Sequence, residues 1–454
     1  MLQSFRIPVR FQTFSLFALL LTFCCSAAAQ TGGSFLCAAT AKKSDVHPLS
    51  AATLYAVSDT SPSGFGFDFG TAPASFEKNA CIGDQPFYFS LTEPDGNYQV
   101  TLVLGGPVAS TTTVRAESRR LMVDQMSVPA KGSKQIVFNV NVRTKFIFPA
   151  DGAPVPPGTK LPEVRLKPRE IGVPNWDDKL TLEFTGDHPS IRSITIQPLH
   201  GVPTVYIAGD STVVDQDKEP WAAWGQMLPV FFGPGVTIAN HAESGETIRS
   251  FVEERRLAKV ESTIRPGDYL LFQFAHNDQK PGPNYVPAAT DFKDYLRRYI
   301  ALARAHGATP ILVTAMNRRN FDADGKIIQT LGDFPQAMRE VAAEQKVALI
   351  DLNAMSKILF ETMGDEGTTH AFVHYAANTF PGQTTEMKDD THFNGYGAYE
   401  LARAVVQSIR DQNLPLAPYL RPGIPPFDPA HPDPLSSWKL PPSPNVSTVT
   451  PYGR

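Results

Sequence analysis

Three residues of this sequence have the types and the order that acyl transfer by a serine requires. Ser211 lies in the run Gly209-Asp210-Ser211-Thr212, and Asp389 precedes His392 by three residues in the run Asp389-Asp390-Thr391-His392. A histidine can take the serine proton through Nε2 when a carboxylate holds Nδ1, and a tight turn lets a carboxylate three residues earlier reach Nδ1. The sequence therefore predicts Ser211 as nucleophile, His392 as general base and Asp389 as the orienting carboxylate.

Two further loops carry groups that could bind a developing oxyanion. Gly245 can present its backbone N–H without an obstructing side chain, and Asn277 carries a side-chain amide. An oxyanion hole consists of such donors aimed at the position of the negative oxygen. We expect the N–H groups of Ser211 and Gly245 and the amide of Asn277 to form it. Each loop alone also suits a structural role, since Gly245 could be a turn residue and Asn277 a helix cap.

The elements that must bring these loops together are predicted from residue 204 onward. Short apolar runs typical of buried parallel strands alternate there with amphipathic segments typical of helices. This rhythm predicts a three-layer α/β domain with a flavodoxin-like parallel sheet, in which ligands bind at the carboxyl ends of the strands. The strands are expected at 204–208, 237–240, 269–275, 310–316 and 347–352, and the helices at 250–262, 292–305, 334–344 and 395–409.

The chain before residue 201 follows a different pattern. Short runs alternate apolar with polar residues and are separated by turn signals, with no convincing helix between them. This pattern predicts an all-β sandwich over residues 30–200, followed by the α/β domain over 201–415 and a proline-rich tail over 416–454. The strands of the sandwich are expected at 87–91, 98–104, 111–116, 135–142, 180–184 and 191–196.

Residues 1–29 have the organisation of an export signal. Two arginines precede an apolar stretch over 14–25 that is too short to span a bilayer, and the alanines at 27–29 supply a cleavage site. We therefore expect a secreted or periplasmic protein without stable membrane insertion once the signal is removed. A lipid anchor at Cys24 or Cys25 is the alternative.

Cysteine content and charge narrow the remaining function classes. Only Cys37 and Cys81 remain after signal removal, and in an oxidising compartment they can pair or stay apart. Two cysteines are too few for a metal site. The chain has 41 Lys and Arg against 45 Asp and Glu, and no basic run interrupts this balance. Nucleic acid is therefore not an expected partner, because phosphate binding requires a concentrated basic surface.

Taken together, the motifs resemble the SGNH (GDSL-type) hydrolases over roughly Thr204 to Arg410. The flanks of the motifs resemble the rhamnogalacturonan acetylesterase branch of that family. This resemblance implies a serine esterase that removes acetyl groups from a polysaccharide, pectic rhamnogalacturonan, through an acyl-enzyme and without a metal or organic cofactor. The motifs that carry it are Gly209-Asp210-Ser211-Thr212, Gly245, Phe274-Ala275-His276-Asn277-Asp278, Arg318-Arg319-Asn320-Phe321, Ile350-Asp351-Leu352 and Asp389-x-x-His392.

Two positions depart from the branch, and two other functions stay open. Ala275 stands where many relatives have glycine, and Glu246 stands where the branch often has arginine. The sandwich resembles a galactose-binding-like domain, in which aromatic residues can bind a sugar face or simply form the core. The alternative functions are a general short-chain esterase or lipase of the same family and a noncatalytic glycan-binding protein.

Overall fold

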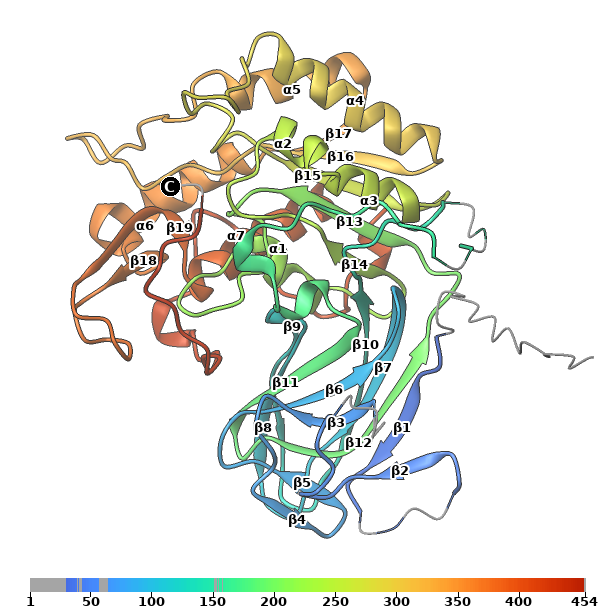
Figure 1. Cartoon of the computed structure of the whole chain (residues 1–454). Helices are drawn as coiled ribbons and strands as arrows, with labels where there is room; N and C mark the ends of the chain where they lie inside the picture. Colours follow the sequence, from blue (N-terminus) through green and yellow to red (C-terminus); the bar gives the residue numbers. More distant parts are fainter. Residues whose placement is uncertain are drawn as a thin grey trace, which may run out of the picture.

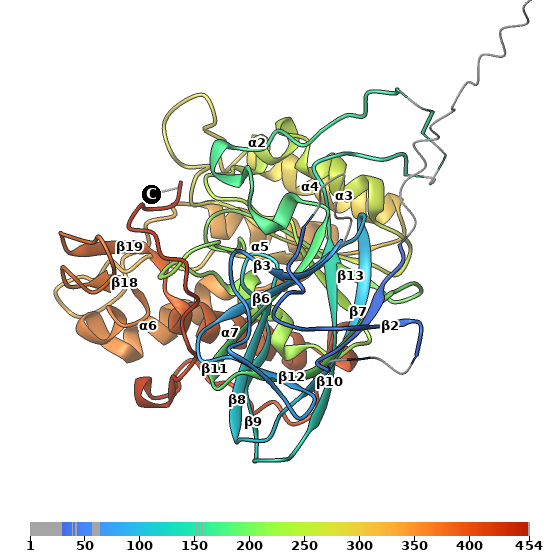
Figure 2. The same cartoon turned by 60° about the horizontal axis from the view of Figure 1, so that its bottom comes forward.

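The computed structural model describes residues 30–38, 40, 43–56, 64–150, 153, 155–156 and 158–452. The predicted export signal and the candidate lipid-anchor cysteines lie outside the described residues. A β-sandwich forms one end of the molecule and a larger α/β body forms the other (Figures 1 and 2). The last sandwich strand, β12, ends at Pro198 and the first parallel strand, β13, begins at Thr204, so the predicted division at residue 201 lies between them.

The sandwich consists of two mainly antiparallel sheets around a shared apolar core. All six predicted strands are present, but β9 and the short strands β1 to β5 were not predicted. The first sheet has the order β10 (Lys134–Val142), β7 (Gly96–Leu104), β12 (Ser190–Pro198), β1 (Gly33–Leu36), β2 (Val46–Pro48), with β5 (Ala80–Ile82) on β12 and β4 (Ser75–Glu77) on β5. The second has the order β3 (Phe65–Asp68), β6 (Phe87–Thr92), β11 (Lys179–Asp187), β8 (Ser110–Ala116), β9 (Arg120–Val128).

A disulfide joins Cys37 to Cys81 inside this core. Cys37 directly follows β1 and Cys81 lies in β5, and both of these strands pair with β12. Both cysteines are buried among the apolar side chains of the two sheets. Of the two possibilities left open by the sequence, the structure therefore has the bonded one.

Replacing both cysteines by alanine is expected to lower the free energy of unfolding by about 4 kcal/mol. The bond spans a sequence separation of 44 residues, and the chain-entropy model gives that value for a loop of this length. Denaturant titration of wild type and the double variant measures the difference. Intact mass after alkylation without reductant is the control, and a loss below about 1 kcal/mol would contradict the expectation.

The α/β body is built on a parallel sheet with helices on both faces, which confirms the predicted three-layer fold. The strand order is β14 (Thr237–Asn240), β13 (Thr204–Gly209), β15 (Tyr269–Gln273), β16 (Thr309–Val313), β17 (Ala348–Ile350). Helices α1 (Trp224–Met227), α6 (Leu352–Thr368) and α7 (Gly395–Asp411) pack on one face. Helices α2 (Ile248–Glu253), α3 (Arg256–Thr263), α4 (Asp291–Ala305) and α5 (Phe334–Gln345) pack on the other.

Several elements of the body differ from the prediction. Helices α1 and α6 were not predicted, and the strands expected to reach residues 275 and 316 end at Gln273 and Val313. The helix expected at 250–262 is two helices, α2 and α3, because Arg255 between them adopts a left-handed conformation with φ 64°. The strand expected to reach residue 352 ends at Ile350, where Asp351 caps α6 by accepting from the Ala354 N–H. The hairpin of β18 (Phe372–Tyr375) and β19 (Met387–Phe393) was also not predicted, although it carries Asp389 and His392.

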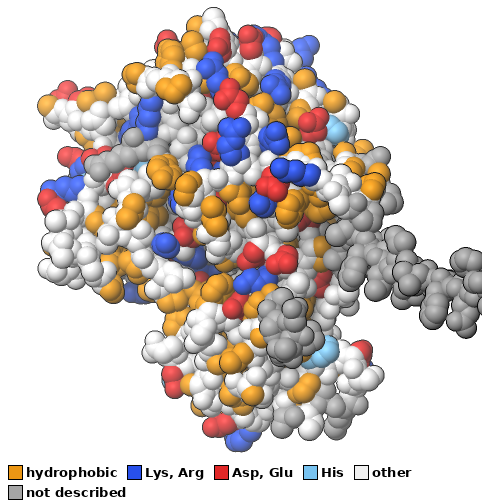
Figure 3. Space-filling view, viewed as in Figure 1, with side chains coloured by type: hydrophobic (Ala, Val, Ile, Leu, Met, Phe, Trp, Pro, Cys, Tyr) orange, Lys and Arg blue, Asp and Glu red, His pale blue; other side chains and the backbone are white. Residues whose placement is uncertain are grey.

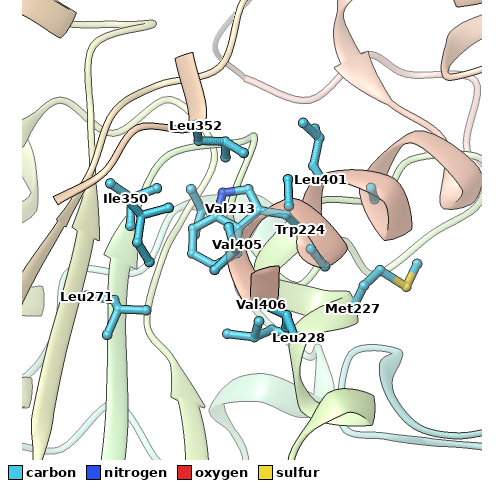
Figure 4. Packing of buried hydrophobic residues seen from close by; sticks show 14 of the residues in the cluster. Val213, Trp224, Met227, Leu228, Leu271, Ile350, Leu352, Leu401, Val405 and Val406 are labelled. Atoms are coloured by element: carbon cyan, nitrogen blue, oxygen red, sulfur yellow. The ribbon is translucent and has the colours of Figure 1, made fainter. Parts of the chain in front are cut away.

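Side chains just beyond Ser211 anchor the nucleophile loop in the core. Val213 and Trp224 lie together with Leu401 and Val405 of α7 in the cluster that Figure 4 shows. The indole Nε1 of Trp224 donates to Gln273 at 3.0 Å, so its one polar group is paired despite full burial. Burial of these apolar side chains therefore holds the segment that follows Ser211 against the sheet.

A buried polar junction connects the sandwich to the same loop. Arg120, at the start of β9, forms an ion pair with Asp215 at 2.6 Å. Its neighbour Arg119 donates to the carbonyl oxygens of Gln216 and Trp221 at 3.1 and 2.9 Å. The sandwich thus contacts the loop that begins at the nucleophile, and it contributes Leu121 to the core of the body.

The proline-rich segment after residue 416 runs over the body in an extended conformation. Its described part, up to residue 452, contains two short 3-10 turns, η4 (Ala417–Tyr419) and η5 (Leu435–Ser437). Near its end it passes Trp221, whose Nε1 donates to the Ser447 carbonyl at 3.1 Å. None of the helices in the described ranges has the length and apolar character needed to cross a membrane.

Candidate active site

The structure brings the three predicted catalytic side chains into one hydrogen-bonded chain. His392 Nε2 lies 2.8 Å from Ser211 Oγ, and His392 Nδ1 lies 2.9 Å from Asp389 Oδ2. All three side chains are buried, with exposures of 0% for Ser211, 1% for His392 and 2% for Asp389. This is the arrangement in which an imidazole can take the serine proton while the carboxylate fixes its other nitrogen.

Backbone geometry in β19 holds Asp389 against the imidazole. Asp389 opposes Val373 and Phe393 opposes Phe372 in the hairpin, so the three residues between Asp389 and Phe393 form a bulge. Asp389 Oδ1 accepts the N–H groups of Thr391 and His392 at 2.8 and 3.0 Å. The tight turn predicted from the spacing is therefore a bulge closed by the carboxylate itself.

The same contacts keep Asp389 ionised. Burial acts to raise the pKa of the Asp389 carboxyl, but the hydrogen bond and charge of His392 and the two backbone N–H groups outweigh it. The net effect is a pKa below the usual value. The carboxylate is thus available to stabilise an imidazolium.

Asp390, the neighbouring candidate, points elsewhere. Its Oδ1 lies 3.0 Å from Arg319 Nη1 and 2.8 Å from His374 Nε2, and half of the side chain is exposed. Because successive strand residues point to opposite faces, Asp390 lies on the face opposite to that of Asp389, which binds His392. Its ion pairs therefore belong to the surface beside the site.

The nucleophile loop follows β13 directly, as predicted. Asp210 Oδ1 accepts both the Thr212 N–H, at 2.9 Å, and the Thr212 hydroxyl, at 2.7 Å. Gln216 Nε2 donates to the Ser211 carbonyl at 3.0 Å. These bonds fix both sides of Ser211, while no acceptor among the described residues takes its N–H. That N–H is free to meet a substrate oxygen.

The two other predicted oxyanion donors lie on adjoining loops. Asn277 Nδ2 donates one hydrogen to the Glu246 carbonyl at 3.0 Å and keeps a second for a ligand. The Gly245 N–H, like that of Ser211, has no acceptor within the described ranges. Gly245 has φ 80°, and a Cβ there would lie 3.0 Å from Cβ of Tyr452. Both the backbone conformation and the available space therefore favour glycine at this position.

A cavity of about 300 Å³ opens beside these donors. Gly245 and Asn277 line it together with Lys280, Tyr452 and the loop around Pro281. Lys280 Nζ donates to Asn277 Oδ1 at 3.1 Å, which orients the amide so that its nitrogen faces Glu246 and the cavity. The cavity therefore opens on the side of the site where two of the predicted oxyanion donors lie.

The two departures from the family pattern have visible structural consequences. Ala275 adopts φ 156°, at the edge of the region that favours glycine, where the chain turns from β15 into the loop of Asn277. Glu246 is fully buried and forms ion pairs with Lys167 at 2.6 Å and Arg256 at 3.2 Å. A carboxylate at this position is therefore matched by cations from elsewhere in the chain.

The sequence did not reveal the outer contacts of the site. Trp221 packs edge-on to His392 with ring centroids 5.9 Å apart, and Tyr452 of the proline-rich segment approaches Gly245. Neither residue belongs to a motif, because both reach the site through folding of distant segments. No group of His, Cys, Asp and Glu suited to a metal ion occurs among the residues that the structure describes.

Comparisons with known proteins show which family this chain resembles. Residues 207–398 match the model of the GDSL-like Lipase/Acylhydrolase family. The chain is 43% identical over 218 residues to the rhamnogalacturonan acetylesterase RhgT of Bacillus subtilis, covering 48% of this chain and 93% of that protein. It is 36% identical over 216 residues to the probable rhamnogalacturonan acetylesterase YesY of the same organism, covering 47% and 94%.

Among solved structures, that of the protein YxiM of Bacillus subtilis is 24% identical in sequence, with a TM-score of 0.45. The superposed part covers 85% of this chain and 99% of the YxiM chain. The sequence matches alone decide the family, since the chain covers nearly the whole length of relatives that are more than 30% identical. They confirm the predicted resemblance. The chain therefore belongs to the GDSL-like lipase/acylhydrolase family, a family of carboxylic ester hydrolases.

Proposed function

We propose that this protein removes acetyl groups from a polysaccharide, pectic rhamnogalacturonan, through an acyl-enzyme on Ser211. The observation that carries the proposal is the buried hydrogen-bonded chain from Asp389 through His392 to Ser211. It supplies an activated nucleophile, and two of the predicted oxyanion donors, Gly245 and Asn277, line a cavity of about 300 Å³. The two relatives named as rhamnogalacturonan acetylesterases support the choice of substrate.

In the proposed reaction, Ser211 Oγ attacks the acetyl carbonyl while its proton passes to His392 Nε2. Asp389 stabilises the imidazolium, and the negative oxygen is bound by the N–H groups of Ser211 and Gly245 and the amide of Asn277. The sugar oxygen leaves as a hydroxyl with the proton from His392. Water then attacks the acetyl-serine with His392 again as base, and acetate and free Ser211 result.

Cationic groups near the cavity support an anionic saccharide. Lys280 lines the cavity, and Arg318 donates to the carbonyl of His276, next to Asn277, at 3.2 Å. Galacturonate units of a pectic chain are anionic, and cations around a cleft favour such ligands. Figure 3 shows one face of the molecule, on which Lys, Arg, Asp and Glu side chains are scattered among hydrophobic and uncharged groups.

Export of the protein is part of the proposal. The disulfide between Cys37 and Cys81 supports a secreted or periplasmic location, because such bonds persist in oxidising compartments. A large acetylated polymer is also met outside the cell. Fractionation of the native host followed by immunodetection tests the location.

The purified protein is expected to hydrolyse 4-nitrophenyl acetate with a much higher kcat/KM than the octanoate. The proposed substrate is an acetyl ester, so the acyl site is expected to fit a methyl group, and each methylene that it excludes costs about 1–3 kcal/mol. The measurement is kcat/KM over acetate, butyrate and octanoate. Preference for octanoate would favour the lipase alternative, and no turnover of any ester would favour the noncatalytic one.

The polymer is tested separately by acetate release. Acetylated rhamnogalacturonan is expected to release acetate faster than acetylated xylan under equal conditions, with chemically deacetylated rhamnogalacturonan as the blank. Faster release from xylan would keep the esterase activity but replace the proposed glycan.

A further inference from the structure

The loop that carries Gly245 is held by a lysine from outside the catalytic body. Lys167 Nζ donates to the Ser244 carbonyl at 2.7 Å and lies 2.6 Å from Glu246 Oε1. Lys167 immediately precedes the short turn η1 (Pro168–Glu170), between the sandwich strands β10 and β11. It lies outside the matched residues 207–398. One cation thus contacts the residues on both sides of Gly245.

The Ser244 carbonyl and the Gly245 N–H belong to the same planar peptide and point in opposite directions. A donor that holds the carbonyl therefore fixes the direction of the N–H. Gly245 has φ 80° and lacks a side chain that would restrict its rotation. The orientation of this peptide consequently depends on contacts from other segments, and Lys167 supplies the contact to its carbonyl.

Other contacts tie the two neighbours of Gly245 to the residues that supply the remaining predicted oxyanion donors. Gln216 Nε2 bridges the Ser211 carbonyl and Ser244 Oγ, at 3.0 and 3.4 Å. On the other side, the Asn277 amide donates to the Glu246 carbonyl at 3.0 Å. Gly245 thus lies between a residue tied to Ser211 and a residue tied to Asn277.

Buried charge keeps the ammonium group of Lys167 in place. Glu246 is fully buried, and its Oε2 accepts the Ser250 hydroxyl at 2.5 Å while Oε1 faces Lys167 and Arg256. A hydrogen bond from a charged donor is stronger than one between neutral groups, and it polarises the peptide it binds. Polarisation of the Ser244 carbonyl makes the Gly245 N–H a better donor to a negative oxygen.

We propose that Lys167 is a positioning residue for the reaction, which orients and polarises the Ser244–Gly245 peptide so that the Gly245 N–H binds the oxyanion. This inference rests on the proposed function, because it assigns Gly245 the role of oxyanion donor. It also gives the N-terminal region a part in catalysis, since the cation comes from the segment between two sandwich strands.

The test compares Lys167→Met with Lys167→Gln, which retains an N–H donor without the charge. Loss of one oxyanion donor lowers kcat by a factor of about 10²–10³. Lys167→Met is expected to misorient the Gly245 N–H rather than remove it, so kcat is expected to fall at least ~10-fold. KM on 4-nitrophenyl acetate is expected to stay within about threefold, because the interaction strengthens only in the transition state. Lys167→Gln is expected to recover part of kcat.

Lys145→Met is the matched control. Lys145 also lies in the N-terminal region and pairs with Glu163 at 3.0 Å, but that pair is well exposed and touches no loop of the site. Its kcat is expected to equal that of wild type. The double variant Lys167→Met, Glu246→Gln guards against misfolding, because it removes the buried Glu246 charge together with the lysine that pairs with it. We expect the kcat of this double variant to fall by the same factor as in Lys167→Met or by a larger one.

A second readout is the rate at which a fluorophosphonate labels Ser211, since the tetrahedral adduct places an oxygen in the same hole. That rate is expected to fall with kcat in Lys167→Met. Wild-type kcat and labelling rate in a folded Lys167→Met or double variant would overturn the inference while leaving the esterase intact. If wild type itself neither turned over an ester nor reacted through Ser211, the proposed function would fail first.

Discussion

Ser211→Ala is expected to lower kcat on an acetyl ester by at least ~10⁴ with the fold retained. The substitution removes the oxygen that lies 2.8 Å from His392 Nε2 and leaves the imidazole without a proton to take. The residual rate above that in water would come from the oxyanion hole and substrate binding alone. Stopped assays at high enzyme concentration, with circular dichroism as folding control, measure the loss.

Ser262→Ala is a suitable control for that experiment. Ser262 is another buried serine of the same body, and its hydroxyl donates to the Lys259 carbonyl within α3, at 2.8 Å. We expect wild-type kcat for this variant and fluorophosphonate labelling like that of wild type. Labelling that persisted in Ser211→Ala would mean that a different residue is the nucleophile.

The sequence predicted the frame of the site because the frame depends on local patterns. The runs after Thr204 are apolar enough to identify buried parallel strands, and a parallel sheet brings the loops after its strands to one edge. Ser211, Gly245 and Asn277 lie in the loops that follow the three strands β13, β14 and β15. In the sandwich, the missed strand β9 begins at Arg120, directly after Arg119. The charges of these two arginines hide the start of the strand, and both side chains bind groups of the body.

The outer parts of the site could not be predicted because they depend on contacts between distant segments. Lys167 is 77 residues from Ser244, and Trp221 is 226 residues from Ser447, the two partners to which they donate. No spacing rule connects such pairs. The hairpin β18–β19 is equally hidden, since Lys388, Asp389 and Asp390 interrupt the apolar alternation that usually indicates a strand. The motif predicted the chemistry there, but not the element that carries it.

Asp389 and Asp390 are adjacent carboxylates, and the structure assigns them opposite environments. Asp389 is buried and lies 2.9 Å from His392 Nδ1. Burial acts to raise the pKa of its carboxyl group, but His392 and two backbone N–H groups lower the pKa below the usual value. Asp390 binds Arg319 and His374 at the surface. Only the first carboxylate can select the tautomer in which Nε2 is free to accept the Ser211 proton.

Asp389→Ala is therefore expected to lower kcat by up to ~10⁴, the loss seen where the wrong histidine tautomer results. The bulge also loses the acceptor of the Thr391 and His392 N–H groups, so Asp389→Asn, which keeps a side-chain oxygen, is the better-matched variant. Both are measured as kcat on 4-nitrophenyl acetate, with thermal unfolding to separate loss of activity from loss of fold.

Asp390→Ala is expected to retain kcat within about tenfold of wild type, because a substitution of an exposed side chain away from the reacting groups has small effects. Arg319 keeps its ion pair with Asp365 when Asp390 is removed, so the surface beside the site loses one of two carboxylates rather than both. An inactive Asp390→Ala together with an active Asp389→Ala would show that the orienting carboxylate is misassigned, even if Ser211 proved to be the nucleophile. Equal and severe losses in both variants would instead mean that the bulge of β19 acts as one unit, in which the surface ion pair of Asp390 sets the position of Asp389.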